Sequence, residues 1–130
     1  MLLHLDRPAD AYVLRGADGH RARVNDRELT ASFLLAPDRL DEAWPVDDAR
    51  LLDVAAIDAL LAWQPEVLVL GTGATQVFPP AAARAACLAR GVGLEVMANA
   101  AAARTFTVLA SEGRRVVAAF VLAGDSSNRR

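Results

Sequence analysis

The chain is poor in the residues that build thiol and metal sites. Of its 130 residues only Cys87 is a cysteine, and only His4 and His20 are histidines. A single cysteine excludes a disulfide framework within one chain. Neither histidine has a second nitrogen or sulfur ligand at the spacing of a zinc site. We therefore expect no metal and no cofactor, and we interpret Cys87, in an alanine-rich helical pattern, as a buried small thiol.

Lysine is also absent, so all 14 basic residues are arginine. The net charge of −2 argues against a nucleic-acid binder that relies on bulk charge. Residues 1–66 hold 13 acids and 7 arginines, whereas residues 67–130 hold 3 acids and 7 arginines. Two interpretations stay open. In the first, the base composition of the genome accounts for the use of arginine in place of lysine. In the second, arginines of the C-terminal half recognise carboxylate or phosphate through the planar guanidinium.

No apolar run approaches the roughly 20 residues of a membrane-spanning helix. The N-terminal MLLHLDRPAD lacks the apolar core of a signal peptide. These features predict no membrane insertion and a cytoplasmic location. The size, 13.8 kDa, predicts one domain over residues 1–130. Within it we expect mostly antiparallel β-structure and loop over 1–50, an α/β unit over 51–123 and a flexible tail over 124–130.

The first part of the chain carries turn signals between short apolar segments. A turn-forming tetrad, Gly16–Gly19, separates Tyr12–Arg15 from Arg21–Val24, and this predicts a β-hairpin. A longer strand is expected from Glu28 to Leu35. The acidic segment 38–48 is expected to be irregular, with at most one short strand.

From Asp53 onwards the apolar period becomes helical, with Asp53 as the cap and Val54 on the buried face. The elements expected there are, in order, a helix ended by Pro65, a strand over 66–70, a helix over about 80–90, a strand over 94–97, a helix from Asn99 to Gly113 and a strand over 115–122. Short crossovers of this kind generate parallel strands. We therefore predict an α/β fold: a three-layer sandwich with a central mixed, largely parallel sheet and an N-terminal β-hairpin.

The stretch VLVLGTG, residues 67–73, has the buried strand and glycine turn with which dinucleotide sites begin. The third glycine of that fingerprint is replaced by Gln76, and Pro79 and Pro80 delay the next helix. A Walker loop needs the lysine that the chain lacks. The turn is therefore not predicted to bind a dinucleotide.

A weaker site prediction survives at the same turn. Ligands of open α/β sheets bind beyond the carboxyl ends of parallel strands, and two such strands are expected to end at Leu70 and Met97. The residues expected to bind a ligand or partner there are Gly71, Thr72, Gly73, Thr75, Asn99 and Arg104. The alternative is that the glycines only permit a tight turn and that Arg104 pairs with Glu95 or Glu112. No catalytic set lies near this edge, although Glu95 could serve as a base if its strand buries it.

The C-terminal half is distinctive in GLEVM (93–97), NAAAARTF (99–106) and VLASEGRRVVAA (108–119). These motifs resemble a family of small domains of unknown function that includes a mitochondrial complex I assembly factor and the adipogenesis-associated domain protein. The resemblance covers nearly the whole chain and implies the same three-layer fold. The motif residues that carry over are Gly71, Thr72, Gly73, Pro79, Glu95, Met97, Arg104, Thr105, Glu112, Gly113 and Arg114. Met97 and Thr105 join the expected binding residues through this resemblance.

The chain departs from the family at Ala98, Ala103 and Thr107, where many members have Asp, Cys and Asn. A role that needs that acid or thiol is therefore not implied here. The resemblance and the scarcity of catalytic residues favour a non-enzymatic protein-binding or assembly module with a protein partner, linked to respiratory complex biogenesis. The alternative is a small-anion binder or modest enzyme at the carboxyl edge of the strands. Homodimerisation is a third hypothesis, with the apolar strand Val116–Leu122 as an exposed edge.

Overall fold

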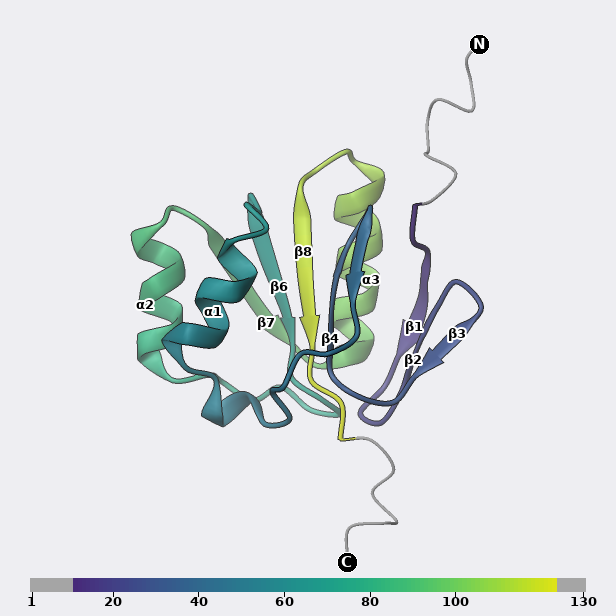
Figure 1. The fold of residues 1–130 in the computed structure, drawn as a ribbon, viewed down its shortest axis with the longest axis horizontal. Coiled ribbons are helices and arrows are strands. Elements are labelled where there is room, and N and C mark those ends of the chain that lie inside the picture. Colours follow the sequence, from purple (N-terminus) through teal and green to yellow (C-terminus); the bar gives the residue numbers. More distant parts are fainter. Residues whose placement is uncertain (1–10, 124–130) are drawn as a thin grey trace, which may run out of the picture.

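The computed structural model describes residues 11–123, which form two sheets and three α-helices (Figure 1). A three-stranded antiparallel sheet contains β1 (Leu14–Ala17), β2 (Ala22–Val24) and β3 (Arg27–Leu29). The hairpin predicted around Gly16–Gly19 is β1–β2 of this sheet. His4 and the tail expected over 124–130 lie outside the described residues.

The larger sheet has five strands in the order β5-β4-β8-β6-β7. Its members are β4 (Phe33–Ala36), β5 (Arg39–Asp41), β6 (Val67–Gly71), β7 (Gly93–Met97) and β8 (Val116–Phe120). Strands β8, β6 and β7 are parallel, whereas β4 pairs antiparallel with both β5 and β8. The predicted α/β fold with a central mixed sheet is confirmed, and its parallel part is this three-stranded core.

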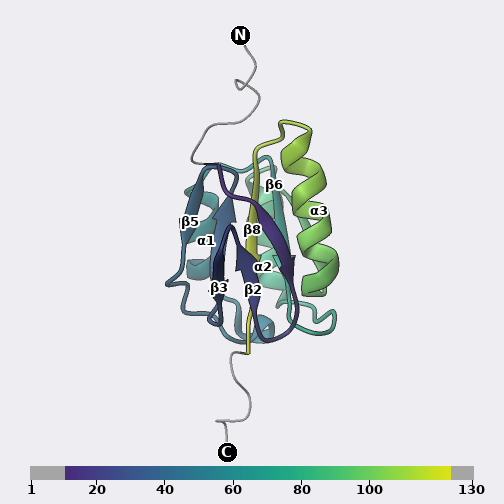
Figure 2. The same cartoon turned by 90° about the vertical axis from the view of Figure 1, so that its right-hand side faces the viewer.

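Helices cover both faces of the five-stranded sheet. On one face, α1 (Val54–Leu61) and α2 (Ala81–Ala89) pack against Leu68 and Leu70 of β6. On the other face, α3 (Asn99–Ser111) packs against β6, and the small sheet joins the core that contains the intervening valines of β6 (Figures 1 and 2). Burial on both faces explains why the β6 sequence is continuously apolar rather than alternating.

Two helix boundaries follow from the side chains that the sequence offers. The Asp53 carboxylate accepts the Ala56 backbone N–H at 2.9 Å, which confirms the predicted cap of α1. Gly113, with φ +76°, follows the end of α3 and supplies the left-handed residue expected there. Val54 was expected on the buried face of α1 but is 44% exposed, because it is the first helical residue and lies beyond the sheet contact.

The thiol of Cys87 is buried on α2, as predicted, with 1% of the residue exposed. Burial raises the pKa of this thiol, because a thiolate is poorly solvated among apolar side chains. The neutral, packed form of the side chain is therefore favoured.

Two expectations about strands are wrong. The single strand expected over 28–35 is divided into β3 and β4, which belong to different sheets. The break lies at Ser32, which is buried and lies between the two strands in the sequence. Its hydroxyl accepts the Leu122 backbone N–H at 2.9 Å and so fixes the chain where it passes from the small sheet to the large one. The C-terminal strand is not an exposed edge either. Strand β8 lies between β4 and β6, so it has no free edge for a second copy of the chain.

Candidate functional site

The carboxyl ends of β6 and β7 meet at one edge of the sheet, as the sequence predicted. Gly71 is paired with Met97 in the parallel ladder. The Thr72 backbone N–H donates to the Met97 carbonyl at 3.0 Å, and the Asn99 backbone N–H donates to the Gly73 carbonyl at 2.8 Å. The structure therefore brings Gly71, Thr72 and Gly73 into contact with the 97–99 segment.

Asn99 is the centre of this junction. It is fully buried, and its side-chain oxygen accepts the Gly73 N–H at 3.1 Å. Its side-chain nitrogen donates to the carbonyls of Asp18 at 2.8 Å and Val121 at 2.9 Å. One amide thus joins the hairpin turn, the glycine turn and the end of β8. Asn99 was expected to cap α3, but Ala98 occupies the cap position, because the Asn99 side chain is committed to these three segments.

The turn after β6 closes on itself. The Thr72 hydroxyl donates to the Thr75 carbonyl at 2.7 Å and accepts the Val77 N–H at 2.9 Å. The Gln76 side chain donates to the Val96 carbonyl at 2.9 Å, so the 72–77 loop reaches across to β7. The amides of Thr72 and Gly73 are already engaged within the protein. Of the predicted binding residues in this turn, Gly71 and Thr72 are buried, Gly73 is partly buried and Thr75 is exposed. The binding role expected for these residues stays a prediction.

Arg104 lies apart from the glycine turn. It is on the exposed face of α3 and lines a groove between α3 and β1, whereas Thr72 and Gly73 line a different hollow. The ion pair with Glu95 or Glu112 that was the alternative for Arg104 is not formed, and within residues 11–123 no carboxylate pairs with Arg104. Thr105 is not among the residues that line this groove, and its hydroxyl donates to the Met97 sulfur at 3.3 Å.

We call the groove that Arg104 lines the α3–β1 groove. It has a volume of about 620 Å³ and is bounded by residues 14–17 of β1 and the side of α3 from Ala100 to Val108. Its lining is mostly small or apolar, and Val108 at its margin is 53% exposed. Arg15 also lines the groove. Its guanidinium donates a hydrogen bond to the Asn25 carbonyl at 3.1 Å. The groove therefore combines apolar surface with two guanidinium groups that no described carboxylate neutralises.

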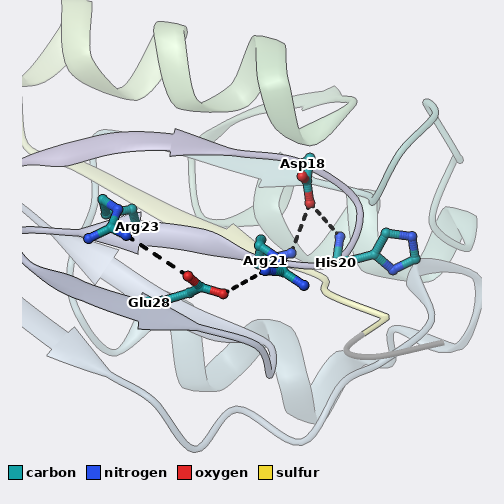
Figure 3. A network of polar contacts seen from close by, with 5 residues as sticks. All are labelled: Asp18, His20, Arg21, Arg23 and Glu28. Carbon is teal, nitrogen blue, oxygen red and sulfur yellow. Dashed lines mark hydrogen bonds and ion pairs between the residues drawn. The ribbon is translucent and has the colours of Figure 1, made fainter. Parts of the chain in front are cut away.

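The neighbouring outer face of the small sheet has its charges paired. Glu28 accepts Arg21 at 2.9 Å and lies 3.9 Å from Arg23 (Figure 3). The Asp18 carboxylate accepts the backbone N–H groups of His20 and Arg21 at 2.8 and 2.9 Å. Arg15 and Arg104 differ from these arginines, because neither makes an ion pair with a carboxylate of residues 11–123.

Three carboxylates acquire lowered pKa values in the fold. The backbone N–H groups of His20 and Arg21 lower the pKa of Asp18, and the Arg50 side chain lowers the pKa of Asp48. The Arg115 backbone N–H and then the Arg114 side chain lower the pKa of Glu66. In each case a hydrogen bond favours the ionised form.

We expect acid to destabilise the protein through these groups. A carboxylate whose pKa is lowered by folding contributes stability above its unfolded pKa of about 4 and loses it as the pH falls through the folded value. The urea midpoint should therefore decrease below about pH 4. The variant Asp18→Asn keeps an oxygen acceptor for the turn but does not titrate, so it should show a shallower decrease. An unchanged pH profile in this variant would show that Asp18 contributes nothing to the acid transition.

Sequence reasoning missed Arg15 and Val108 as partners of Arg104 in one groove. An arginine in the predicted hairpin and an exposed apolar residue on the last helix were the available signals. Neither indicates that the hairpin packs beside that helix.

A family model described as "Protein of unknown function (DUF498/DUF598)" matches residues 14–121. The chain is also similar to a Xanthomonas campestris protein solved by NMR, with 51% identity, a TM-score of 0.84 and 95% of each chain covered. A Bordetella pertussis solution structure, called an Mth938-like domain, is 30% identical with a TM-score of 0.75, over 96% of this chain and 94% of that one.

A third relative is the "13 kDa major membrane protein" of Francisella tularensis, 31% identical over 71 residues, or 55% of this chain and 58% of that protein. The chain matches little more than half of the length of its curated relatives. Among the helices of residues 11–123, none combines the length and the apolar character that crossing a bilayer requires.

Proposed function

The chain belongs to the DUF498/DUF598, Mth938-like family, which includes a mitochondrial complex I assembly factor and the adipogenesis-associated domain protein, and we propose that it is a protein-binding module. The observation that carries the proposal is the α3–β1 groove. A link to the assembly of respiratory complexes is supported by the family resemblance, and a cytoplasmic location by the sequence patterns described above.

The groove fits an acidic and apolar segment of a partner protein. Ala100 and Val108 offer exposed apolar surface, and burying such surface is the main favourable term of most protein association. Arg15 and Arg104 would bind carboxylates of the partner. The planar guanidinium can donate two parallel hydrogen bonds to one carboxylate. Arginine is also enriched among the residues that dominate binding energies.

We expect Arg104→Glu to weaken capture of the partner by about tenfold or more, because it places a like charge against the partner's carboxylates. The measurement is crosslinking of the purified chain, with a photoreactive residue at position 107, in an extract of the cells that produce it. Arg84→Glu on α2 is the matched control, since it changes the same charge on the opposite face of the sheet.

The crosslinked species should weaken with added salt and should persist in the Arg84 variant. Equal yields from the Arg104 variant and the unmodified chain would refute the groove as the binding surface. Both variants change exposed side chains, so loss of folding is not the expected explanation of a difference.

A small-anion site at the sheet edge is a second candidate function. It is supported by a hollow of about 260 Å³ that Gly73, His20 and Arg50 line. Asp47 and Asp48 line the same hollow, and Asp48 holds the Arg50 guanidinium at 2.9 Å. Because these acids repel an anion and occupy the arginine, the α3–β1 groove is the better supported site.

A further inference from the structure

A second concave surface lies on the other side of the molecule, and we call it the Trp44 hollow. It has a volume of about 440 Å³ and is formed by the 44–51 segment and by the side of α1 from Asp53 to Ala59. Because α1 covers the face of the large sheet opposite α3, the hollow and the α3–β1 groove are separated by the sheet (Figure 1).

The Trp44 hollow is lined by apolar and by acidic residues. Trp44, Pro45 and Val46 line it, and Leu51 at its margin is 72% exposed. Three carboxylates line it as well, those of Asp47, Asp48 and Asp53, and no basic residue does.

Two of these carboxylates already have partners. Asp48 pairs with the Arg50 side chain, and Asp53 accepts the Ala56 N–H. Asp47 is exposed and makes no ion pair with any residue between 11 and 123. The charge offered to solvent is therefore negative, the reverse of that at the α3–β1 groove.

Trp44 adds an observation that does not depend on charge. The residue is 6% exposed, and its indole N–H is buried without a hydrogen-bond acceptor in the described part of the chain. A buried donor without an acceptor carries a free-energy cost. Trp44, which lines the hollow, is thus incompletely satisfied in the described part of the chain.

We propose that the Trp44 hollow is a second docking surface and that its occupant is a basic, apolar segment of a partner protein. Apolar side chains of that segment cover Leu51 and the apolar residues that line the hollow, and its arginine or lysine residues face Asp47. With an acidic partner at the α3–β1 groove, the chain would join two proteins of opposite charge.

The test uses two short synthetic peptides with the same leucines, one with arginine and the other with glutamate at every charged position. Each is titrated into the full-length ¹⁵N-labelled chain while the ¹H–¹⁵N spectrum is recorded. The arginine peptide is expected to shift the backbone amides of residues 46–56 and the indole N–H of Trp44. The indole of Trp63 is an internal control, because it is equally buried and stacks on Arg39 away from the hollow.

The double variant Asp47→Asn/Leu51→Ser should weaken binding of the arginine peptide about tenfold. Asp26→Asn, in the β2–β3 turn, should leave it unchanged. Both changes are at exposed residues, so the variant is expected to fold.

Three results would overturn the proposal: no shift in residues 44–59, shifts spread evenly over all acidic surfaces, or equal binding by the double variant. The glutamate peptide separates this proposal from the proposed function, because its shifts should fall on residues 100–108. Either surface can therefore fail while the other stands.

Discussion

Replacement of Gly71 by alanine is expected to lower the free energy of unfolding by about 3–5 kcal/mol. A Cβ atom at this position would lie 2.3 Å from the side-chain oxygen of Asn99 and 2.9 Å from Cδ1 of Phe120. Both neighbours are fully buried, so neither can move into solvent. The substitution therefore combines overpacking of the core with disruption of the hydrogen bonds of Asn99.

Two other glycines separate this clash from the general effect of replacing glycine. Gly16→Ala meets no atom within 4 Å, and we expect a change of at most about 0.5 kcal/mol. Gly73→Ala also meets no atom, but its φ of +113° is one that alanine rarely adopts, so a loss of about 1–3 kcal/mol is expected. Urea unfolding followed by tryptophan fluorescence gives the three values. A loss at Gly71 as small as that at Gly16 would show that the contact with Asn99 does not limit the residue at this position.

The sequence was sufficient for the order of the elements in the C-terminal half. The apolar period of α1, the cap at Asp53 and the glycine after α3 are local signals, and each element forms where its own residues favour it. The order of the strands in the sheets depends on contacts between residues that are far apart in the sequence. The division between β3 and β4 depends on Ser32 and Leu122, which are 90 residues apart in the chain.

The candidate site was predictable only in part, for the same reason. Parallel strands must end at a common edge, so the contact between Gly73 and Asn99 could be anticipated. The position of Arg104 depends on where the small sheet packs against α3, and no spacing in the sequence specifies that contact. The role of Asn99 could not be predicted either, because an asparagine that caps a helix and one that is buried in the first turn stand at nearly the same place in the sequence.

The variant Asn99→Ala is expected to lose about 3–5 kcal/mol of unfolding free energy. Alanine leaves the buried carbonyl of Val121 and the partly buried Gly73 N–H and Asp18 carbonyl without their partner. Each unsatisfied buried group costs about 1–3 kcal/mol, reduced where water can enter. Hydrogen exchange should also accelerate at the 18–21 turn, because the side-chain nitrogen of Asn99 anchors that turn.

Asn99→Asp is the matched variant, because it preserves the shape of the side chain while it replaces the donating NH₂ by a carboxyl oxygen. Its carboxylate can still accept the Gly73 N–H, but it places negative charge against the carbonyls of Asp18 and Val121. Burial and these oxygens should raise the pKa of the introduced carboxyl, since both disfavour the charged form. Its deficit relative to the unmodified chain should therefore be greatest at neutral pH and shrink towards about pH 5, where protonation restores one donor. A deficit independent of pH would mean that the donated hydrogen bonds do not hold the three segments together, and that packing alone joins the hairpin to the glycine turn.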